Sequence, residues 1–162
     1  MNHAFLLTGS NMGNRHEQLK TAADQLEDDG IRILQNSSIY ETAAWGIEAQ
    51  PAFLNQALHI ETSLGPRQLL RHVLRIEKRM GRIREIKYGP RLIDIDILLF
   101  NNEIHDYPLL KLPHPELPNR RFALTALAEI AATHIHPVFQ KSIADLLAQC
   151  TDPLPVKRLD TQ

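Results

Sequence analysis

Two aspartates lie two positions apart in a run of aliphatic residues near the middle of the chain. The run reads Leu92-Ile93-Asp94-Ile95-Asp96-Ile97 and continues to Phe100. Such a density of β-branched residues predicts a strand, in which Asp94 and Asp96 share one face about 6 to 7 Å apart while the isoleucines enter the core. Paired carboxylates repel each other unless cations join them, and hard oxygen ligands suit Mg²⁺, which completes its shell with water and substrate phosphates. The pattern indicates metal-dependent phosphate chemistry; the alternative is a strand whose solvated face happens to be acidic.

Basic residues precede this acidic strand directly. They are Arg82, Arg84, Lys87 and Arg91. Arginine and lysine neutralise phosphate oxygens, and phosphoryl transfer depends mainly on positioning and on neutralising charge that grows in the transition state. A solvated basic loop that balances the acidic strand is the alternative, and the adjacency of the two charge clusters favours the phosphate site.

Four further positions could contact a ligand. His114 lies between two prolines that fix its direction, which suits either a phosphate-contacting imidazole or a turn residue. Phe53 and Phe122 are core aromatics by default. Asn55, however, shares the strand face of Phe53, so a planar ligand stacked on that ring could be hydrogen-bonded by the neighbouring amide.

Hydrophobic periodicity and helix-start signals predict the helices and strands that carry these residues. Asn14 is expected to cap a first helix, Pro66 to open a second one that stops at Gly81, and Asn119 to cap a third. Strands are expected at residues 4–8, 31–34, 37–42, 53–63, 92–100 and 103–104, and a last helix at 141–149. The order β-α-β-β-α-β predicts an α+β fold, a ferredoxin-like antiparallel or mixed sheet with helices on both faces in three layers. We expect one domain over residues 1–162, with a frayed tail from residue 151.

Composition narrows the class of protein. The 162 residues carry a formal net charge of -1, which argues against a general binder of nucleic acid or of anionic membranes. A single cysteine, Cys150, excludes an intramolecular disulfide. No apolar run approaches the ~18 residues of a membrane span, and the N-terminus has no basic region before its short apolar stretch. We therefore expect a cytoplasmic protein.

The residues resemble the hydroxymethyl-dihydropterin pyrophosphokinases of folate biosynthesis from about residue 4 to about residue 147. The most specific match is Gly89-Pro90-Arg91-Leu92-Ile93-Asp94-Ile95-Asp96-Ile97, which is similar to the family signature of Gly-Pro-Arg followed by the two-aspartate strand. Supporting matches are Gly9-Ser10-Asn11, Tyr40-Glu41-Thr42, Phe53-Leu54-Asn55, Glu77 with Gly81-Arg82-Ile83-Arg84, and Pro113-His114 followed by Asn119-Arg120 and Phe122.

The resemblance implies an ATP-dependent pyrophosphokinase that transfers pyrophosphate to the hydroxymethyl group of 6-hydroxymethyl-7,8-dihydropterin and releases AMP. It implies that Asp94 and Asp96 hold two Mg²⁺ ions, and that Arg82 and Arg91 meet the phosphates as charge builds. Positions that match the ATP side are Glu77, Arg84, Ile97, His114 and Arg120. Positions that match the pterin side are Thr42, Ala43, Trp45, Phe53, Asn55, Asp94 and Phe122. Loops at residues 44–51 and 81–90 would close over the substrates and exclude water.

Two other functions remain to be weighed. A nucleotidyl transferase or cyclase can use the same sheet with two metal-binding aspartates, and its products distinguish it. A noncatalytic RNA-binding sheet needs exposed aromatics with basic flanks, whereas an acidic pair occupies that face here. The expected partners are therefore small molecules, ATP and the reduced pterin alcohol, bound by a monomer without nucleic acid or membrane.

Overall fold

The protein is built on an antiparallel sheet, as seen in a computed structural model that describes residues 1–43, 51–81 and 92–159. Within these residues the sheet has six strands in the order β5-β1-β4-β3-β8, with β2 also paired to β4. The strands are β1 (Asn2–Ser10), β2 (Arg32–Asn36), β3 (Tyr40–Thr42), β4 (Phe53–Thr62), β5 (Asp94–Phe100) and β8 (Val156–Arg158). All pairs are antiparallel. The predicted ferredoxin-like α+β class is confirmed.

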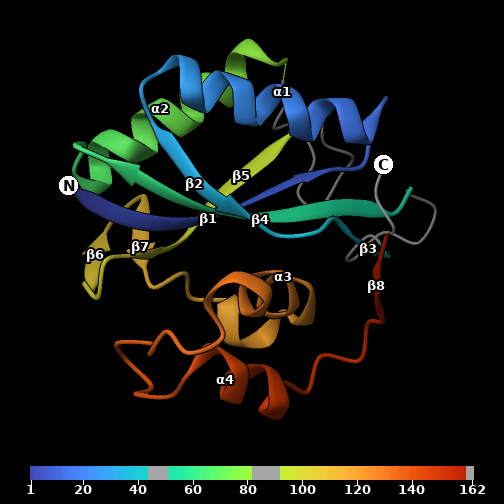
Figure 1. Ribbon diagram of the computed structural model, residues 1–162, viewed down its shortest axis with the longest axis vertical. Helices are drawn as coiled ribbons and strands as arrows, with labels where there is room; N and C mark the ends of the chain where they lie inside the picture. Colours follow the sequence, from blue (N-terminus) through green and yellow to red (C-terminus); the bar gives the residue numbers. More distant parts are fainter. Residues whose placement is uncertain (44–50, 82–91, 160–162) are drawn as a thin grey trace.

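Helices cover both faces of the sheet (Figure 1). One layer holds α1 (Arg15–Asp28) and α2 (Pro66–Arg79), and the other holds α3 (Arg121–Ala131) and α4 (Ile143–Gln149). None of the helices among the described residues is long and apolar enough to cross a membrane. The three layers therefore enclose two apolar cores, one on each side of the sheet.

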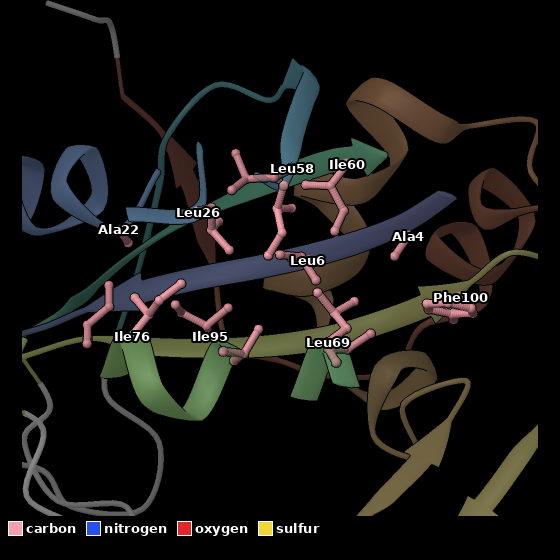
Figure 2. Packing of buried hydrophobic residues seen from close by; sticks show 14 of the residues in the cluster. Ala4, Leu6, Ala22, Leu26, Leu58, Ile60, Leu69, Ile76, Ile95 and Phe100 are labelled. Carbon is pink, nitrogen blue, oxygen red and sulfur yellow. The ribbon is translucent and has the colours of Figure 1, made fainter. Parts of the chain in front are cut away.

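The core beneath α1 and α2 shows how the strand pattern produces the layers. Figure 2 shows Leu6 of β1, Leu58 and Ile60 of β4 and Ile95 of β5 on this side of the sheet, together with Leu26 and other helical residues. Residues of a strand that are two positions apart point to the same face. The intervening side chains of β1, Phe5 and Leu7, accordingly belong to the other core.

The first two helices begin where the sequence predicts. The side chain of Asn14 accepts a hydrogen bond from the backbone N–H of Glu17, which satisfies one of the free donors of the first turn of α1. Pro66 occupies the first turn of α2, and the side chain of Gln68 accepts from the Gly65 N–H. Gly81, with φ 87°, follows the end of α2 in the left-handed region that glycine adopts freely.

Strand β5 contains a bulge that changes the alternation of its side chains. Its register with β1 runs Leu6 to Ile97 and then Phe5 to Leu99, so Leu98 is an extra residue. Leu98 and Leu99 therefore both enter the core beside α3, while Phe100 enters the core beside α1 and α2. The bulge explains how two consecutive residues, Leu98 and Leu99, enter the same core.

The region after β5 differs from expectation. The strand predicted at residues 103–104 is wrong, because β6 (His105–Tyr107) pairs with β7 (Leu110–Leu112) in a separate hairpin. The hairpin is followed by a short 3-10 helix, Leu117–Asn119. Asn119 does not cap α3, because its side-chain amide donates to Glu116 and the N-cap position is Arg120.

The C-terminal segment also differs from expectation. The last helix begins at Ile143 rather than at residue 141, because Ser142 is its cap. The tail predicted to fray from residue 151 contains Asp152, which is 6% exposed, and strand β8, which pairs with β3. A three-residue strand is too short to show a hydrophobic period, so its pairing could not be predicted from its own residues.

Candidate active site

The two aspartates lie on the sheet face covered by α3 and α4. Asp96 is paired with Leu7 of β1, and paired residues in a sheet share a face. Leu7 belongs to the core beside α3, so Asp94 and Asp96 point to that side. Ile95 and Ile97 are buried on the opposite side, as predicted. Both carboxylates are only partly buried, because they line a cleft at the end of the sheet.

This cleft collects residues from β1, β3, β4 and β5 and from the start of α3. Aspartates lie at one end, and aromatic and polar residues lie at the other. The lining consists of Leu7, Gly9, Thr42, Ala43, Phe53, Asn55, Asp94, Asp96, Arg120 and Phe122. Eight of these were predicted as site residues, and the fold brings them together from positions up to 80 residues apart, counting from Thr42 to Phe122.

Asn55 is held against β1 at the centre of the cleft. It is 6% exposed, pairs with Gly9, and donates from Nδ2 to the backbone carbonyl of Thr8 at 3.2 Å. Gly9 was not predicted as a site residue. The available signal was a glycine within a strand, which often marks a close approach of another group to the backbone.

The hydroxyl of Thr42 lies in the cleft wall formed by β3. Thr42 is 4% exposed, and its Oγ1 has no hydrogen-bond partner among the described residues. A buried hydroxyl without a partner costs free energy, which a ligand that hydrogen-bonds it would recover. Thr42 pairs with Phe53 of β4, so a polar and an aromatic side chain adjoin in the same wall.

Phe122 lies across the cleft in the first turn of α3. The guanidinium of Arg120 lies over its ring, with Cζ 5.9 Å from the ring centroid. This distance falls within the range of a cation–π contact. The cleft therefore has an aromatic ring from β4 and a second one from α3, with a cation beside the second.

His114 is placed near the acidic end of the cleft by the bulge in β5. Its backbone N–H donates to the carbonyl of the bulged residue Leu98 at 2.9 Å, and its Nδ1 accepts from the Glu116 N–H. Burial lowers the pKa of the His114 imidazole below its ordinary value, and the charge of Arg120 lowers it further, while Asp94 and Glu116 oppose these effects. An imidazole that accepts at Nδ1 carries its proton at Nε2, which can donate to an oxygen.

Two of the predicted ATP-side residues have their side chains away from the cleft. Glu77 of α2 is 2% exposed, and its carboxylate accepts from the Ile95 N–H at 2.7 Å. Strand β5 is the edge of the sheet formed by the described strands, so this bond satisfies a donor that none of those strands reaches. Ile97 is packed in the core beside α1 and α2. The predicted residues Trp45, Arg82, Arg84 and Arg91 lie outside the described residues, as do residues 44–50 and 82–90 of the two predicted closing loops.

A metal centre made by protein groups alone is not present in the described part of the chain. No group of three or more histidine, cysteine, aspartate or glutamate side chains there is placed to hold a metal ion. A pair of carboxylates is nevertheless a sufficient protein contribution for Mg²⁺, which usually takes one or two carboxylates and completes its shell with waters and substrate phosphates.

Comparisons with known proteins identify the class of this fold and cleft. Residues 5–132 match the family model described as 7,8-dihydro-6-hydroxymethylpterin-pyrophosphokinase (HPPK). The chain is similar to the 2-amino-4-hydroxy-6-hydroxymethyldihydropteridine pyrophosphokinases of Aquifex aeolicus (strain VF5), 42% identical over 91% of both chains, and of Bacillus subtilis (strain 168), 45% identical over 80% of this chain and 78% of that one.

Solved structures and longer relatives extend these matches. A crystal structure of Plasmodium falciparum HPPK-DHPS A437G with STZ-DHP has a TM-score of 0.74 at 16% identity, and the similarity covers 91% of this chain and 45% of that chain. Longer fungal relatives match as well, and this chain spans about a fifth of their length. The fold is shared with parts of larger proteins.

These matches make the protein an ATP-dependent transferase of the pyrophosphokinase class. More particularly, the chain belongs to the 7,8-dihydro-6-hydroxymethylpterin-pyrophosphokinase family. Enzymes of this family transfer pyrophosphate from ATP to hydroxymethyldihydropterin in folate biosynthesis, and the function expected from the sequence is confirmed.

Proposed function

We propose that this enzyme performs the transfer in the described cleft, with the pterin at the aromatic end and the triphosphate of ATP at the acidic end. The observation that carries the proposal is that one cleft is lined both by the aspartate pair and by two phenylalanines beside an amide. Transfer between two substrates requires both to be held within reach of each other in one site. A cleft with two chemically different ends meets this requirement.

The pterin end offers the chemistry that a flat, polar-edged heterocycle needs. Phe53 and Phe122 would sandwich the ring, and aromatic pairs of this kind add affinity beyond the area they bury. Asn55 would read the polar edge with its amide, while Thr42 would contribute its hydroxyl. Ala43 and Trp45 would contact the ring from the segment that follows β3.

Mg²⁺ fits the donor set of the acidic end. Asp94 and Asp96 supply hard oxygen ligands on one rigid face, and the phosphates of ATP would supply the rest. When bound, two Mg²⁺ ions would neutralise the triphosphate and favour attack by the hydroxyl group. Asp94 lies nearer the pterin end, since it pairs with Gly9 opposite Asn55, so we also assign it a contact to the hydroxymethyl substrate.

The remaining predicted residues would serve the ATP side. Arg120 and the Nε2–H of His114 would donate to phosphate oxygens. Arg82 and Arg91 would stabilise the charge that develops during transfer, with Arg84 beside them. Glu77 and Ile97 would act indirectly, because their side chains support β5 from the side of α1 and α2.

The transfer itself needs one displacement at phosphorus. The pterin hydroxyl oxygen forms a bond to the β-phosphorus of ATP, and the bond from that phosphorus to the α,β-bridging oxygen breaks. AMP leaves with the bridging oxygen, and the hydroxyl proton is released to water. The enzyme contributes positioning, charge neutralisation and exclusion of competing water rather than covalent chemistry.

Product analysis tests this proposal. The enzyme is incubated with Mg²⁺, ATP and 6-hydroxymethyl-7,8-dihydropterin, and nucleotides are separated by ion-exchange chromatography. We expect AMP and a pyrophosphorylated pterin in equal amounts. Release of pyrophosphate with a nucleotidylated acceptor would instead identify a nucleotidyl transferase and overturn the assignment.

We further propose that the enzyme works in the cytoplasm as a monomer. The support for the compartment is that a single cysteine needs no oxidising environment. Light scattering after size exclusion tests the monomer: a mass near 18.5 kDa is expected.

A further inference from the structure

The C-terminal segment, residues 150–158, connects the lower helical layer to the sheet. It leaves α4, passes the first turn of α3 and continues as β8 beside β3 (Figure 1). This segment lies beyond residues 5–132, which match the family model. It contacts two elements that form opposite walls of the cleft.

The first contact fixes the start of α3. Asp152 is 6% exposed, and its Oδ2 accepts from the backbone N–H of Arg121, the first residue of α3, at 3.0 Å. In return the Arg121 guanidinium donates to the backbone carbonyls of Asp152 at 3.1 Å and Cys150 at 2.8 Å. The N-cap residue Arg120 makes no capping bond with its own side chain, so Asp152 supplies the cap from 31 positions away. A carboxylate at this end is also favoured by the helix dipole.

The second contact fixes β3. Val156 pairs with Thr42, and the N–H of Leu159 donates to the carbonyl of Ile39 at 2.9 Å. β3 has only three residues and would otherwise be an edge strand, so β8 doubles its backbone pairing. Thr42 is held from one side by β4 and from the other by β8.

The opposite end of α3 is anchored independently. Glu129 accepts from Tyr40 Oη at 2.6 Å and from the N–H and hydroxyl of Ser38. These bonds hold the last turns of α3 to the region of β3. The first turn, which carries Phe122, takes its cap from Asp152 instead.

We propose that Asp152 is a positioning residue for the pterin end of the cleft, acting through Arg121 and the first turn of α3 to hold Phe122 opposite Phe53 and Thr42. This role rests on the proposed function. Asp152 does not contact substrate itself. The aspartate pair lies on β5, at the far edge of the sheet from β8, and the start of α3 would reach the nucleotide through Arg120 alone. The role therefore predicts a larger effect on the pterin than on the nucleotide.

Binding measurements on full-length variants test the role. Asp152→Ala removes the cap. Asp152→Asn keeps one acceptor oxygen for the two N–H groups that bond the carboxylate, those of Arg121 and Leu154. Ser142→Ala is the matched control, because it removes the cap of α4 without contacting the cleft. Calorimetry gives the dissociation constant of a nonhydrolysable ATP analogue with Mg²⁺, and then that of 6-hydroxymethyl-7,8-dihydropterin in the presence of the analogue.

Asp152→Ala is expected to raise the pterin dissociation constant about tenfold. The dissociation constant of the analogue should rise by less than about threefold, through Arg120. Asp152→Asn should lie in between, and Ser142→Ala should stay near the unaltered protein. Equal weakening of both ligands, no weakening, or the same effect from Ser142→Ala would overturn the role. If Asp152→Ala does not fold, Arg121→Ala, which removes only the two guanidinium bonds, replaces it with the same criteria. Failure of the unaltered protein to bind the pterin would overturn the pterin cleft itself and is recognised before any variant is compared.

Discussion

Gly9 and Asn55 approach each other so closely that a Cβ at position 9 would lie 2.4 Å from the Asn55 side-chain nitrogen. Real side chains do not reach this distance, so the amide must move if residue 9 gains a methyl group. The amide now bonds to the carbonyl of Thr8 and lines the cleft. The identity of residue 9 therefore controls the position of a group on the neighbouring strand.

We accordingly predict that Gly9→Ala raises the KM for the pterin by about tenfold or more, because the amide loses its bond and its direction. The protein should remain folded, since the displaced group is the end of a side chain. Steady-state kinetics at saturating ATP measure the effect. Gly65→Ala is the control, because its Cβ would meet only Gln68 at 3.7 Å; an unchanged pterin KM in Gly9→Ala would contradict the prediction.

Asp96→Ala should abolish turnover and leave the fold intact. The residue is assigned to metal ligation rather than to packing, and a metal ion contributes several kcal/mol to transition-state stabilisation, so the rate should fall about a thousandfold or more. AMP release and thermal unfolding measure the two properties. Asp106→Ala on β6, whose side chain is 79% exposed, should keep full activity. Wild-type rates in Asp96→Ala would refute the metal site.

Glu77→Ala should destabilise the protein by about 1 to 3 kcal/mol, because the Ile95 N–H would lose its partner in a buried position. Glu77→Gln should cost less, since it keeps an acceptor oxygen. Urea unfolding gives both free energies. Exposed Glu27 on α1 provides the control, and Glu27→Ala should change stability little. Equal stability of the two alanine variants would show that the Glu77 bond does not support β5.

Stability should fall as the pH drops below about 6.5. Burial is the largest cause that lowers the pKa of four imidazoles below the ordinary 6.5, those of His59, His114, His134 and His136. Well above this pH the four imidazoles are neutral in both the folded and the unfolded chain. As the pH falls below it, the imidazoles of the unfolded chain take up protons first. The free energy of unfolding therefore decreases until the imidazoles of the folded protein are protonated as well. Urea unfolding at pH 7.5 and pH 5 measures the loss.

The contribution of one imidazole, that of His136, to this pH dependence can be measured separately. His136 is buried and accepts at Nδ1 from the N–H groups of Val138 and Phe139. In His136→Asn the amide oxygen can accept the same bonds but does not titrate, so the loss of stability between the two pH values should be smaller. An unchanged loss would assign the pH dependence to other groups.

Much of the cleft could be predicted because its signals are local. The direction of Asp94 and Asp96 follows from strand alternation, and the same rule relates Asn55 to Phe53. The family resemblance added Thr42 and Arg120, which share no local pattern, and it assigned Phe122 to the pterin side. The prediction that Asn119 caps α3 was wrong because the cap is non-local. Asn119 has the right residue type, but the capping carboxylate belongs to Asp152, far along the chain.

The direction of a side chain could also not be predicted from the sequence where that side chain hydrogen-bonds the backbone of another element. Glu77 was assigned to the nucleotide side, yet its side chain is bonded to the edge strand beneath the aspartates. The bulge at Leu98 could not be read from an unbroken apolar run, although it places His114 near Asp94. Both features depend on which strand forms the edge of the sheet.

The pairing of β8 with β3 has a consequence for synthesis on the ribosome. Domains acquire structure from the N-terminal end as the chain emerges, and every lining residue of the cleft precedes β8 in that order. The strand that flanks Thr42 is nevertheless translated after all of them. A nascent chain released before residue 158 would carry every residue assigned to the site, but the β3 wall at the pterin end of the cleft would lack its pairing with β8.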